Sequence, residues 1–283
     1  MSLIVGVHGV GNYVPGYPLE EIAAQRAALW ATSLATGLGS SLENDDVAFA
    51  YYAHHLRRNL PVAQGPDDDA LDHLTPDETA LVTHWLEALD LPESTAQGRL
   101  TMPLRHAVAI VAKRFSLDGK LTRAFIALCF REVAAYLSAP DAPARHAARE
   151  EVASAIATHQ PRVVIAHSLG TVVTYEALHA HPELTIDLLI TLGSPLAMPH
   201  GVFHRLLPAP INGQATRPPG VARWVNVTDH GDPVAILRPL KQYFPDIDLD
   251  LQDSIDLFDF HRAASYLRSP VVAATLAPYF PRH

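Results

Sequence analysis

The chain has 283 residues, of which 48% are hydrophobic and 18% charged, and this balance excludes the disordered and collagen-like classes. The formal net charge is −9, and the 21 lysines and arginines are scattered along the sequence, so we expect no nucleic-acid partner. The length allows one large α/β domain or two small ones and does not choose between them. The single cysteine, Cys129, has no partner for an internal disulfide, and its apolar surroundings favour a small buried hydrophobe.

The N-terminal segment, residues 1–11, has no basic region before its apolar run, and the run ends at His8-Gly9. This pattern predicts a first strand rather than a signal peptide. The most apolar long stretch, residues 121–137, carries the charged residues Arg123, Arg131 and Glu132 and is therefore not expected to span a membrane. We therefore expect a cytoplasmic protein.

Short apolar, β-branched runs followed by turn residues predict buried strands, at 3–8, 47–52, 162–167, 186–192 and 222–228. Helical patterns lie between these runs and after the last, at 19–38, 142–159, 170–180 and 263–279. This alternation predicts the α/β class, with a mainly parallel, doubly wound sheet.

A long insertion, residues 53–140, separates the second predicted strand from the third. It begins with a polar, loop-like stretch at 64–69 and continues with helical patterns at 76–88, 103–115 and 121–137. We interpret it as a helical cap within a single domain that spans residues 1–283. Its basic residues, Lys113 and Arg114 among them, flank apolar stretches, but such helices pack more often on their own domain, so we do not expect membrane binding.

The strongest chemical signal is Val-Val-Ile-Ala-His-Ser-Leu-Gly-Thr over residues 163–171, where a buried strand runs through a serine directly into a helix. The small residues Ala166 and Gly170 permit a very tight turn, which lifts the Ser168 hydroxyl above the carboxyl end of the sheet. The motif resembles the nucleophile elbow of the α/β-hydrolase superfamily, and its wording is similar to that of lipase-like serine esterases. The family usually has glycine where this chain has Ala166. The resemblance implies an α/β-hydrolase fold with Ser168 as nucleophile.

A serine nucleophile needs a base and an acid that orients the base, and the resemblance implies the chain order Ser, Asp or Glu, His. Two carboxylates, Asp229 and Asp232, follow the strand at 222–228. The Asp-Pro-Val wording after position 232 resembles the acid loop of lipase-like hydrolases and favours Asp232. Asp229 stays open as the alternative acid, or as a turn residue that bonds its own backbone.

The base lies downstream of the acid, where the chain offers His261 and the terminal His283. His261 stands just before the last predicted helix, and its His-x4-Tyr-Leu wording is similar to several esterases of the family. We therefore expect a catalytic triad of Ser168, His261 and Asp232, with His230 as the reserve base.

The oxyanion hole is predicted at His8-Gly9-Val10-Gly11, which ends the first strand and resembles the His-Gly loop of lipases. The resemblance implies that the N–H groups of Val10, or alternatively Gly9, and of Leu169 bind the oxyanion, while His8 braces the loop. Leu-Gly-Ser-Pro-Leu, at 192–196, resembles a turn near the family's active site. We interpret its Ser194 as structural.

Two other interpretations are weighed against these. The glycines at positions 9 and 11 suggest a dinucleotide-binding loop, but Val14 replaces the third glycine and Pro15 and Pro18 delay the helix. Histidines of the insertion suggest a metal site, yet their spacing matches no His-Glu-x-x-His pattern: His54, His55, His73 and His84. We therefore expect neither a cofactor nor a metal.

The expected function is that of a serine-dependent carboxylic ester hydrolase that acts on a small, apolar ester through an acyl-enzyme. An acyltransferase or a thioesterase uses the same residues, and a receptor or scaffold on the same fold binds without turnover. The substrate and the oligomeric state are not encoded in any motif that we recognise.

Overall fold

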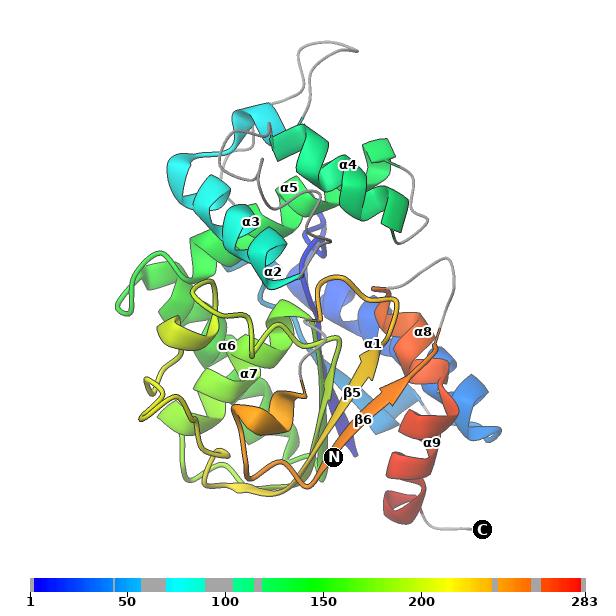
Figure 1. Ribbon diagram of the computed structural model, residues 1–283. Helices are drawn as coiled ribbons and strands as arrows, with labels where there is room; N and C mark the ends of the chain where they lie inside the picture. The colour runs from blue at the N-terminus through cyan, green and yellow to red at the C-terminus, as the bar shows by residue number, and fades with distance from the viewer. Residues whose placement is uncertain are drawn as a thin grey trace.

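The computed structural model describes residues 3–42, 44–56, 70–89, 104–114, 119–235, 239–255 and 261–280. In these ranges one sheet lies between helices, as Figure 1 shows. The strands are β1 Ile4–Val7, β2 Val47–Ala50, β3 Val163–His167, β4 Ile186–Leu192, β5 Val221–Asp229 and β6 Leu249–Asp253. The helices are α1 Leu19–Leu38, α2 Ala53–Leu56, α3 Pro76–Ala88, α4 Leu104–Arg114, α5 Gly119–Tyr136, α6 Pro143–His159, α7 Leu169–Ala180, α8 Ala263–Arg268 and α9 Pro270–Leu276.

The strand order is β2-β1-β3-β4-β5-β6, and every pairing is parallel. The predicted α/β class is therefore confirmed. The chain leaves β1 toward β2 and later returns to the other side of β1 as β3, so the winding direction reverses between β1 and β3. Loops at the carboxyl ends of the strands beside such a reversal form the usual binding crevice of open α/β sheets.

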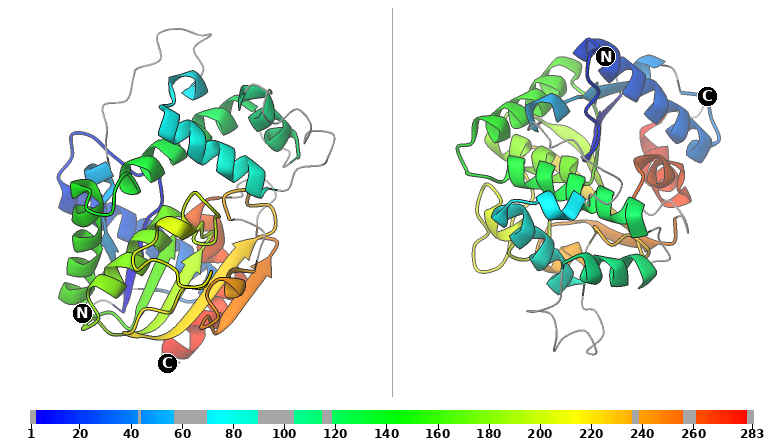
Figure 2. Two further views of the ribbon diagram at one scale, coloured as in Figure 1. Left: turned by 60° about the vertical axis from the view of Figure 1, so that its left-hand side comes forward. Right: turned by 90° about the horizontal axis from the view of Figure 1, so that it is seen from above.

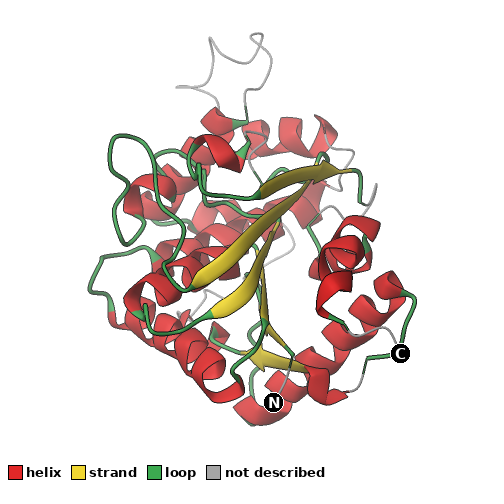
Figure 3. Cartoon of the chain, turned by 90° about the horizontal axis from the view of Figure 1, so that it is seen from below, coloured by secondary structure: helices red, strands yellow, loops and turns green. Residues whose placement is uncertain are grey.

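Helices cover both faces of the sheet (Figure 3). Successive strand residues point to opposite faces, so Val164 packs into the core beneath α6 and α7, while Val163 and Ile165 pack into the core beneath α1, α8 and α9. Each face thus has its own apolar core, and both anchor β3, the strand that ends one residue before Ser168.

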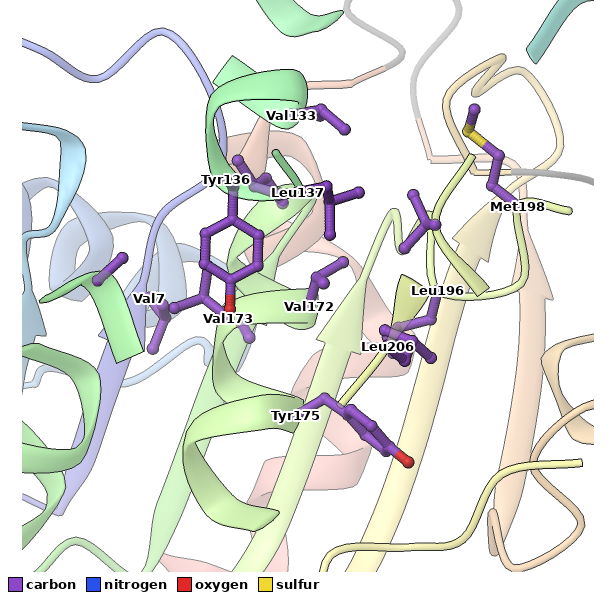
Figure 4. Close-up of a cluster of buried hydrophobic side chains, with 14 of the residues drawn as sticks. Val7, Val133, Tyr136, Leu137, Val172, Val173, Tyr175, Leu196, Met198 and Leu206 are labelled. Atoms are coloured by element: carbon purple, nitrogen blue, oxygen red, sulfur yellow. The ribbon is translucent and has the colours of Figure 1, made fainter. Parts of the chain in front are cut away.

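The helices of the predicted cap, α3, α4 and α5, lie over the carboxyl ends of the strands (Figures 1 and 2). The expected helix at 76–88 is found as α3, and those at 103–115 and 121–137 as α4 and α5. The predicted polar loop at 64–69 lies outside the described residues. Figure 4 shows Val133 and Tyr136 of α5, and Leu137 just after it, above Val172 and Val173 of α7, so this cap helix shares the core of the sheet domain.

Two predicted elements need correction. The sequence pattern for buried strands misses β6, because its Leu-Asp-Leu-Gln-Asp sequence alternates charged and apolar residues, as an edge strand that pairs only with β5 permits. The single helix expected at 263–279 is divided into α8 and α9. Pro270 lacks the N–H that would continue α8, and Ser269 caps α9 by accepting the Val272 N–H at 3.2 Å.

No helix in the described part of the chain combines the length and apolar character that a membrane span requires.

Candidate active site

Ser168 occupies a strained turn between β3 and α7. Its φ of 53° and ψ of −129° are a backbone conformation that costs a non-glycine residue about 1–3 kcal/mol. The surrounding backbone holds this conformation: the Ser168 N–H donates to the Leu192 carbonyl of β4 at 2.9 Å, and Thr171 donates its N–H and its hydroxyl to the Ser168 carbonyl. The side chain is 1% exposed. The turn therefore presents a single buried hydroxyl at the carboxyl end of the sheet.

The turn and the loop after β1 approach each other so closely that each needs a glycine at the contact. A Cβ at Gly170 would lie 2.3 Å from the backbone oxygen of His8, and a Cβ at Gly9 would lie 2.6 Å from Cβ of Ser168. The loop after β1 thus rests directly against Ser168. Ala166, two residues before Ser168, is fully buried in β3.

His261 and Asp232 continue a hydrogen-bonded chain from Ser168. Nε2 of His261 lies 2.8 Å from Oγ of Ser168, and Nδ1 lies 2.7 Å from Oδ2 of Asp232. Because a carboxylate only accepts hydrogen bonds, this arrangement assigns the imidazole proton to Nδ1. Nε2 then has its lone pair available to the serine hydroxyl. All three residues are at least 92% buried, since their exposed fractions are 1%, 8% and 0% for Ser168, His261 and Asp232.

The second oxygen of Asp232 is occupied by the backbone of its own loop. Oδ1 accepts the N–H groups of Val234 at 2.9 Å and of Ala235 at 3.3 Å. Asp229 serves a different purpose: its carboxylate accepts the N–H groups of Gly231 and Ile255. The structure therefore brings Asp232, and not Asp229, to the imidazole.

Tyr266 adds a fourth group to the chain. Its hydroxyl donates to Oδ2 of Asp232 at 2.8 Å and accepts the Asp229 N–H at 3.0 Å. Burial raises the pKa of this phenol well above its ordinary value of 10.0, so the hydroxyl keeps its proton and remains a donor. Oδ2 of Asp232 thus receives hydrogen bonds from both His261 and Tyr266, which hold it in one position.

The loop after β1 presents the Val10 N–H group. Among the described residues this N–H has no hydrogen-bond partner. The Gly9 carbonyl of the same peptide accepts a hydrogen bond from Asn12 Nδ2 at 3.1 Å and lies 2.7 Å from Nδ1 of His8. Since a trans peptide directs its N–H opposite to its carbonyl, Asn12 and His8 fix the direction of the Val10 N–H.

His8 is a neutral brace for this loop. Its Nε2 accepts the Tyr52 N–H at 3.1 Å, so Nδ1 carries the proton and donates to the Gly9 carbonyl. The Tyr52 hydroxyl in turn donates to the His8 carbonyl at 2.7 Å. Burial lowers the pKa of His8 from 6.5 to about 3, which keeps the ring uncharged at neutral pH.

The N–H of Leu169 is the second predicted oxyanion donor. Leu169 is the first residue of α7, and the first N–H groups of a helix have no partner within the helix. The helix dipole adds partial positive charge at this end. The two N–H groups therefore flank Ser168 from α7 and from the loop after β1.

A cap residue supports the same loop. Both carboxylate oxygens of Glu132, on α5, accept the Gly11 N–H, at 3.2 and 3.1 Å. Burial raises the pKa of Glu132 from 4.5 to about 7, against the opposing effect of the Gly11 hydrogen bond. The cap is thus attached to the loop that carries Val10.

An apolar pocket lies beside Ser168, with the cap forming a large part of its wall. The described residues that line it together with Ser168 are Trp85 of α3, Cys129, Phe130 and Val133 of α5, Leu169 of α7, and Pro195, Met198, Val202 and Val234 from loops. Trp85 also ties the cap to the acid loop, because its Nε1–H donates to the Pro233 carbonyl at 2.6 Å. Burial raises the pKa of Cys129, so this lining residue remains a thiol.

The turn after β4 packs under the acid and base. Gly193 has a φ of 54°, and a Cβ there would lie 2.9 Å from Oδ2 of Asp232 and 3.3 Å from Nδ1 of His261. Ser194 bonds to Thr171 at 2.8 Å and accepts the Leu196 N–H at 3.2 Å. The turn is thus shaped around the Asp232–His261 pair, and the Ser194 hydroxyl is engaged by Thr171 of α7 and by the N–H of Leu196 in its own loop.

His167 packs against the predicted base, with its ring centroid 4.7 Å from that of His261. Burial lowers its pKa well below 6.5, so it is neutral. A second positive charge is thereby kept away from a protonated His261.

The structure brings together Ser168, Asp232, His261, Val10 and Leu169 at one end of the sheet. It does not bring Asp229 to the imidazole, and His230 is exposed. Sequence reasoning missed the roles of Tyr266, Glu132, Asn12 and Gly193. A signal existed for Tyr266, in the His-x4-Tyr wording after His261, and for Gly193, in the Leu-Gly-Ser-Pro-Leu turn.

Comparisons of this chain with protein-family models, with curated proteins and with solved structures found no match.

Proposed function

We propose that this protein is a serine-dependent carboxylic ester hydrolase on an α/β-hydrolase fold. The observation that carries the proposal is the buried hydrogen-bonded chain from Ser168 through His261 to Asp232. A serine hydroxyl, an imidazole and a carboxylate in this order are the parts of a nucleophile with its base and orienting acid.

In the first step Oγ of Ser168 attacks the ester carbonyl while Nε2 of His261 takes the hydroxyl proton. Asp232 stabilises the imidazolium that forms, and the N–H groups of Val10 and Leu169 bind the negative oxygen of the tetrahedral intermediate. The imidazolium then gives its proton to the departing alcohol, which leaves Ser168 acylated.

In the second step a water molecule gives a proton to Nε2 of His261 and attacks the acyl carbonyl. Collapse of the second tetrahedral intermediate releases the acid and returns the proton to Oγ of Ser168. Every proton that leaves the serine is thereby restored within one cycle.

The topology also supports the proposal. His8 and Val10 follow β1, and Ser168 follows β3, so the reacting groups lie on the two strands that flank the reversal of winding. The order β2-β1-β3-β4-β5-β6, the helices on both faces and the helices over the carboxyl ends suit an α/β-hydrolase with a cap.

The pocket supports a small ester with an apolar, uncharged group. Phe130, Val133, Met198 and the other described side chains around Ser168 offer hydrocarbon, aromatic and sulfur surface and no cation that would pair with a carboxylate. An apolar acyl or alcohol group gains about 25 cal/mol for each Å² that it buries there.

Labelling with a fluorophosphonate probe, followed by mass mapping of the modified peptide, tests the proposal. We expect one adduct, on Ser168, and its loss in Ser168→Ala. Ser194→Ala is the matched control, because this nearby buried serine is bonded to Thr171 and should leave the Ser168 adduct in place. Labelling that persists in Ser168→Ala would refute the assignment.

Turnover of a short p-nitrophenyl ester separates a hydrolase from a receptor on the same fold. Loss of Ser168 or His261 should lower kcat by on the order of 10⁶, and loss of the acid by less. Asp232→Asn should therefore be far more damaging than Asp229→Asn. The reverse order would transfer the role of the acid to Asp229.

A further inference from the structure

A second cluster of chemically active side chains lies outside the pocket of Ser168. His54 and His55 are the two central residues of the short helix α2, which follows β2, and Glu151 lies on α6. One ligand atom from each of the three residues can be chosen so that all lie within 4.8 Å of one another. All three residues are partly exposed, so the cluster lies at the surface of the molecule.

The spacing within this cluster suits a shared ion better than a direct hydrogen bond. Nε2 of His55 lies 3.5 Å from Oε2 of Glu151, which is beyond the usual range of an N–H···O bond. Two ligands of a tetrahedral zinc ion, each about 2.1 Å from it, lie about 3.4 Å apart. The His55–Glu151 distance is therefore close to that of two ligands around one metal.

The two imidazoles are held close to each other without a hydrogen bond between them in the described structure. Their ring centroids are 3.8 Å apart, and Nδ1 of His54 is enclosed and has no hydrogen-bond partner among the described residues. An imidazole nitrogen that has no hydrogen-bond partner can offer its lone pair to a metal ion.

We propose that His54, His55 and Glu151 bind a divalent transition-metal ion, with Zn²⁺ as the best match. Two imidazoles and one carboxylate are ligands that zinc accepts at about 2.0–2.2 Å, and a water molecule completes the tetrahedron. The ion would connect α2, at the start of the cap insertion, with α6 of the sheet domain. Its role is therefore to fasten the base of the cap, independently of the proposed esterase reaction.

His181, which has two carboxylate neighbours, provides a comparison, because its neighbours do not converge on one point as the ligand atoms of the cluster do. His181 contacts Glu150 through Nε2 at 3.0 Å and Glu183 through Nδ1 at 3.1 Å. Because the two carboxylates bond to opposite nitrogens of the ring, they do not converge on one point. His181→Ala is therefore a matched control that removes a carboxylate-paired histidine near α6.

The site is tested by calorimetric titration of Zn²⁺ into the full chain. The protein carries no affinity tag and is first freed of metal with a chelator. We expect saturable binding of one Zn²⁺ per chain, and Mg²⁺, which prefers oxygen ligands, should bind far more weakly. Loss of a second-shell partner typically lowers metal affinity by about 10–100-fold, and loss of a direct ligand should cost at least as much. His55→Ala and Glu151→Gln should therefore each weaken zinc binding by at least this factor. His181→Ala should bind zinc like the parent.

A thermal measurement gives a readout that does not depend on activity. Zinc at about 100 times its Kd should raise the Tm of the parent and of His181→Ala by roughly 5 °C, and a chelator should reverse the shift. His55→Ala and Glu151→Gln, which alter partly exposed side chains, should stay folded by circular dichroism and show no such shift. Absence of saturable zinc binding in the parent, or parent-like affinity in both variants, would overturn the proposal.

Discussion

Glu132 of the cap helix α5 accepts the backbone N–H of Gly11 with both carboxylate oxygens, although 121 positions separate the two residues. Gly11 follows directly after Val10, whose N–H is a proposed oxyanion donor. The cap therefore supports part of the proposed catalytic machinery in addition to lining the pocket.

Glu132→Ala should lower kcat for a short p-nitrophenyl ester by about 10–100-fold, with a smaller change in KM. Without Glu132 the loop after β1 is held less firmly, which weakens the Val10 N–H as an oxyanion donor. Complete loss of such a donor lowers kcat by about 10²–10³. Glu132→Gln retains an acceptor for the Gly11 N–H and should keep most of the activity. Steady-state kinetics on both variants make the comparison. Equal losses in the two would show that charge, and not the hydrogen bond, matters.

The same carboxyl group should make stability depend on pH. Its pKa is raised from 4.5 to about 7, so between these values the folded chain binds more protons than the unfolded chain. The contribution of Glu132 to the free energy of unfolding therefore falls as pH rises through this window. The free energy of unfolding of the parent minus that of Glu132→Gln should drop by about 1–3 kcal/mol between pH 5 and pH 8 in urea titrations. A difference that is constant or rises with pH would contradict this expectation.

The hydroxyl of Tyr266 should act as a positioning group for the acid. Tyr266→Phe removes the O–H donor of Asp232 and leaves the Asp229 N–H without its acceptor, so we expect kcat to fall about tenfold while KM changes little. Tyr175→Phe is the matched control, because the Tyr175 hydroxyl is also buried but has no hydrogen-bond partner in the described structure. The kcat of both variants across pH 5–9 is the measurement. An unchanged pH profile and kcat in Tyr266→Phe would assign the residue to packing alone.

The origin of each part of the site explains how far the sequence alone could predict it. A local strand-turn-helix pattern in the sequence predicts Ser168. The family resemblance implies the order of Ser168, Asp232 and His261 along the chain. Tyr266 and Glu132 act through contacts between distant elements. Glu132 is the single carboxylate of α5, and nothing in the sequence of that helix indicates that it reaches the loop after β1. The cluster of His54, His55 and Glu151 is similar, since its third member comes from a helix about 100 positions away. Neighbours of this kind follow from packing and not from spacing in the chain.

The contact between Gly9 and Ser168 should tolerate no side chain. A Cβ at position 9 would lie 2.6 Å from Cβ of Ser168 and 3.0 Å from Nδ1 of His167, so Gly9→Ala must push the loop away from the nucleophile. We expect kcat to fall by about 10²–10³, the effect of losing one oxyanion donor. Gly119→Ala is the control, because the nearest atom to its added Cβ is the end of Arg123, at 3.5 Å. Parent-like kcat in Gly9→Ala would separate this loop from catalysis.

The buried ion pair of Arg145 and Glu176 should contribute more to stability than any exposed pair. It joins α6 to α7, and Tyr136 of α5 donates to the same carboxylate at 2.7 Å. Arg145→Met leaves a charged carboxylate buried without its cation, so we expect the free energy of unfolding to fall by about 3–5 kcal/mol, with partial recovery when Glu176→Leu is added. Arg162→Met, which breaks the exposed pair with Asp187, should cost at most about 1 kcal/mol. Urea titrations of these variants measure the free energies of unfolding. An equal decrease in Arg145→Met and Arg162→Met would show that burial adds nothing to the contribution of the Arg145–Glu176 pair.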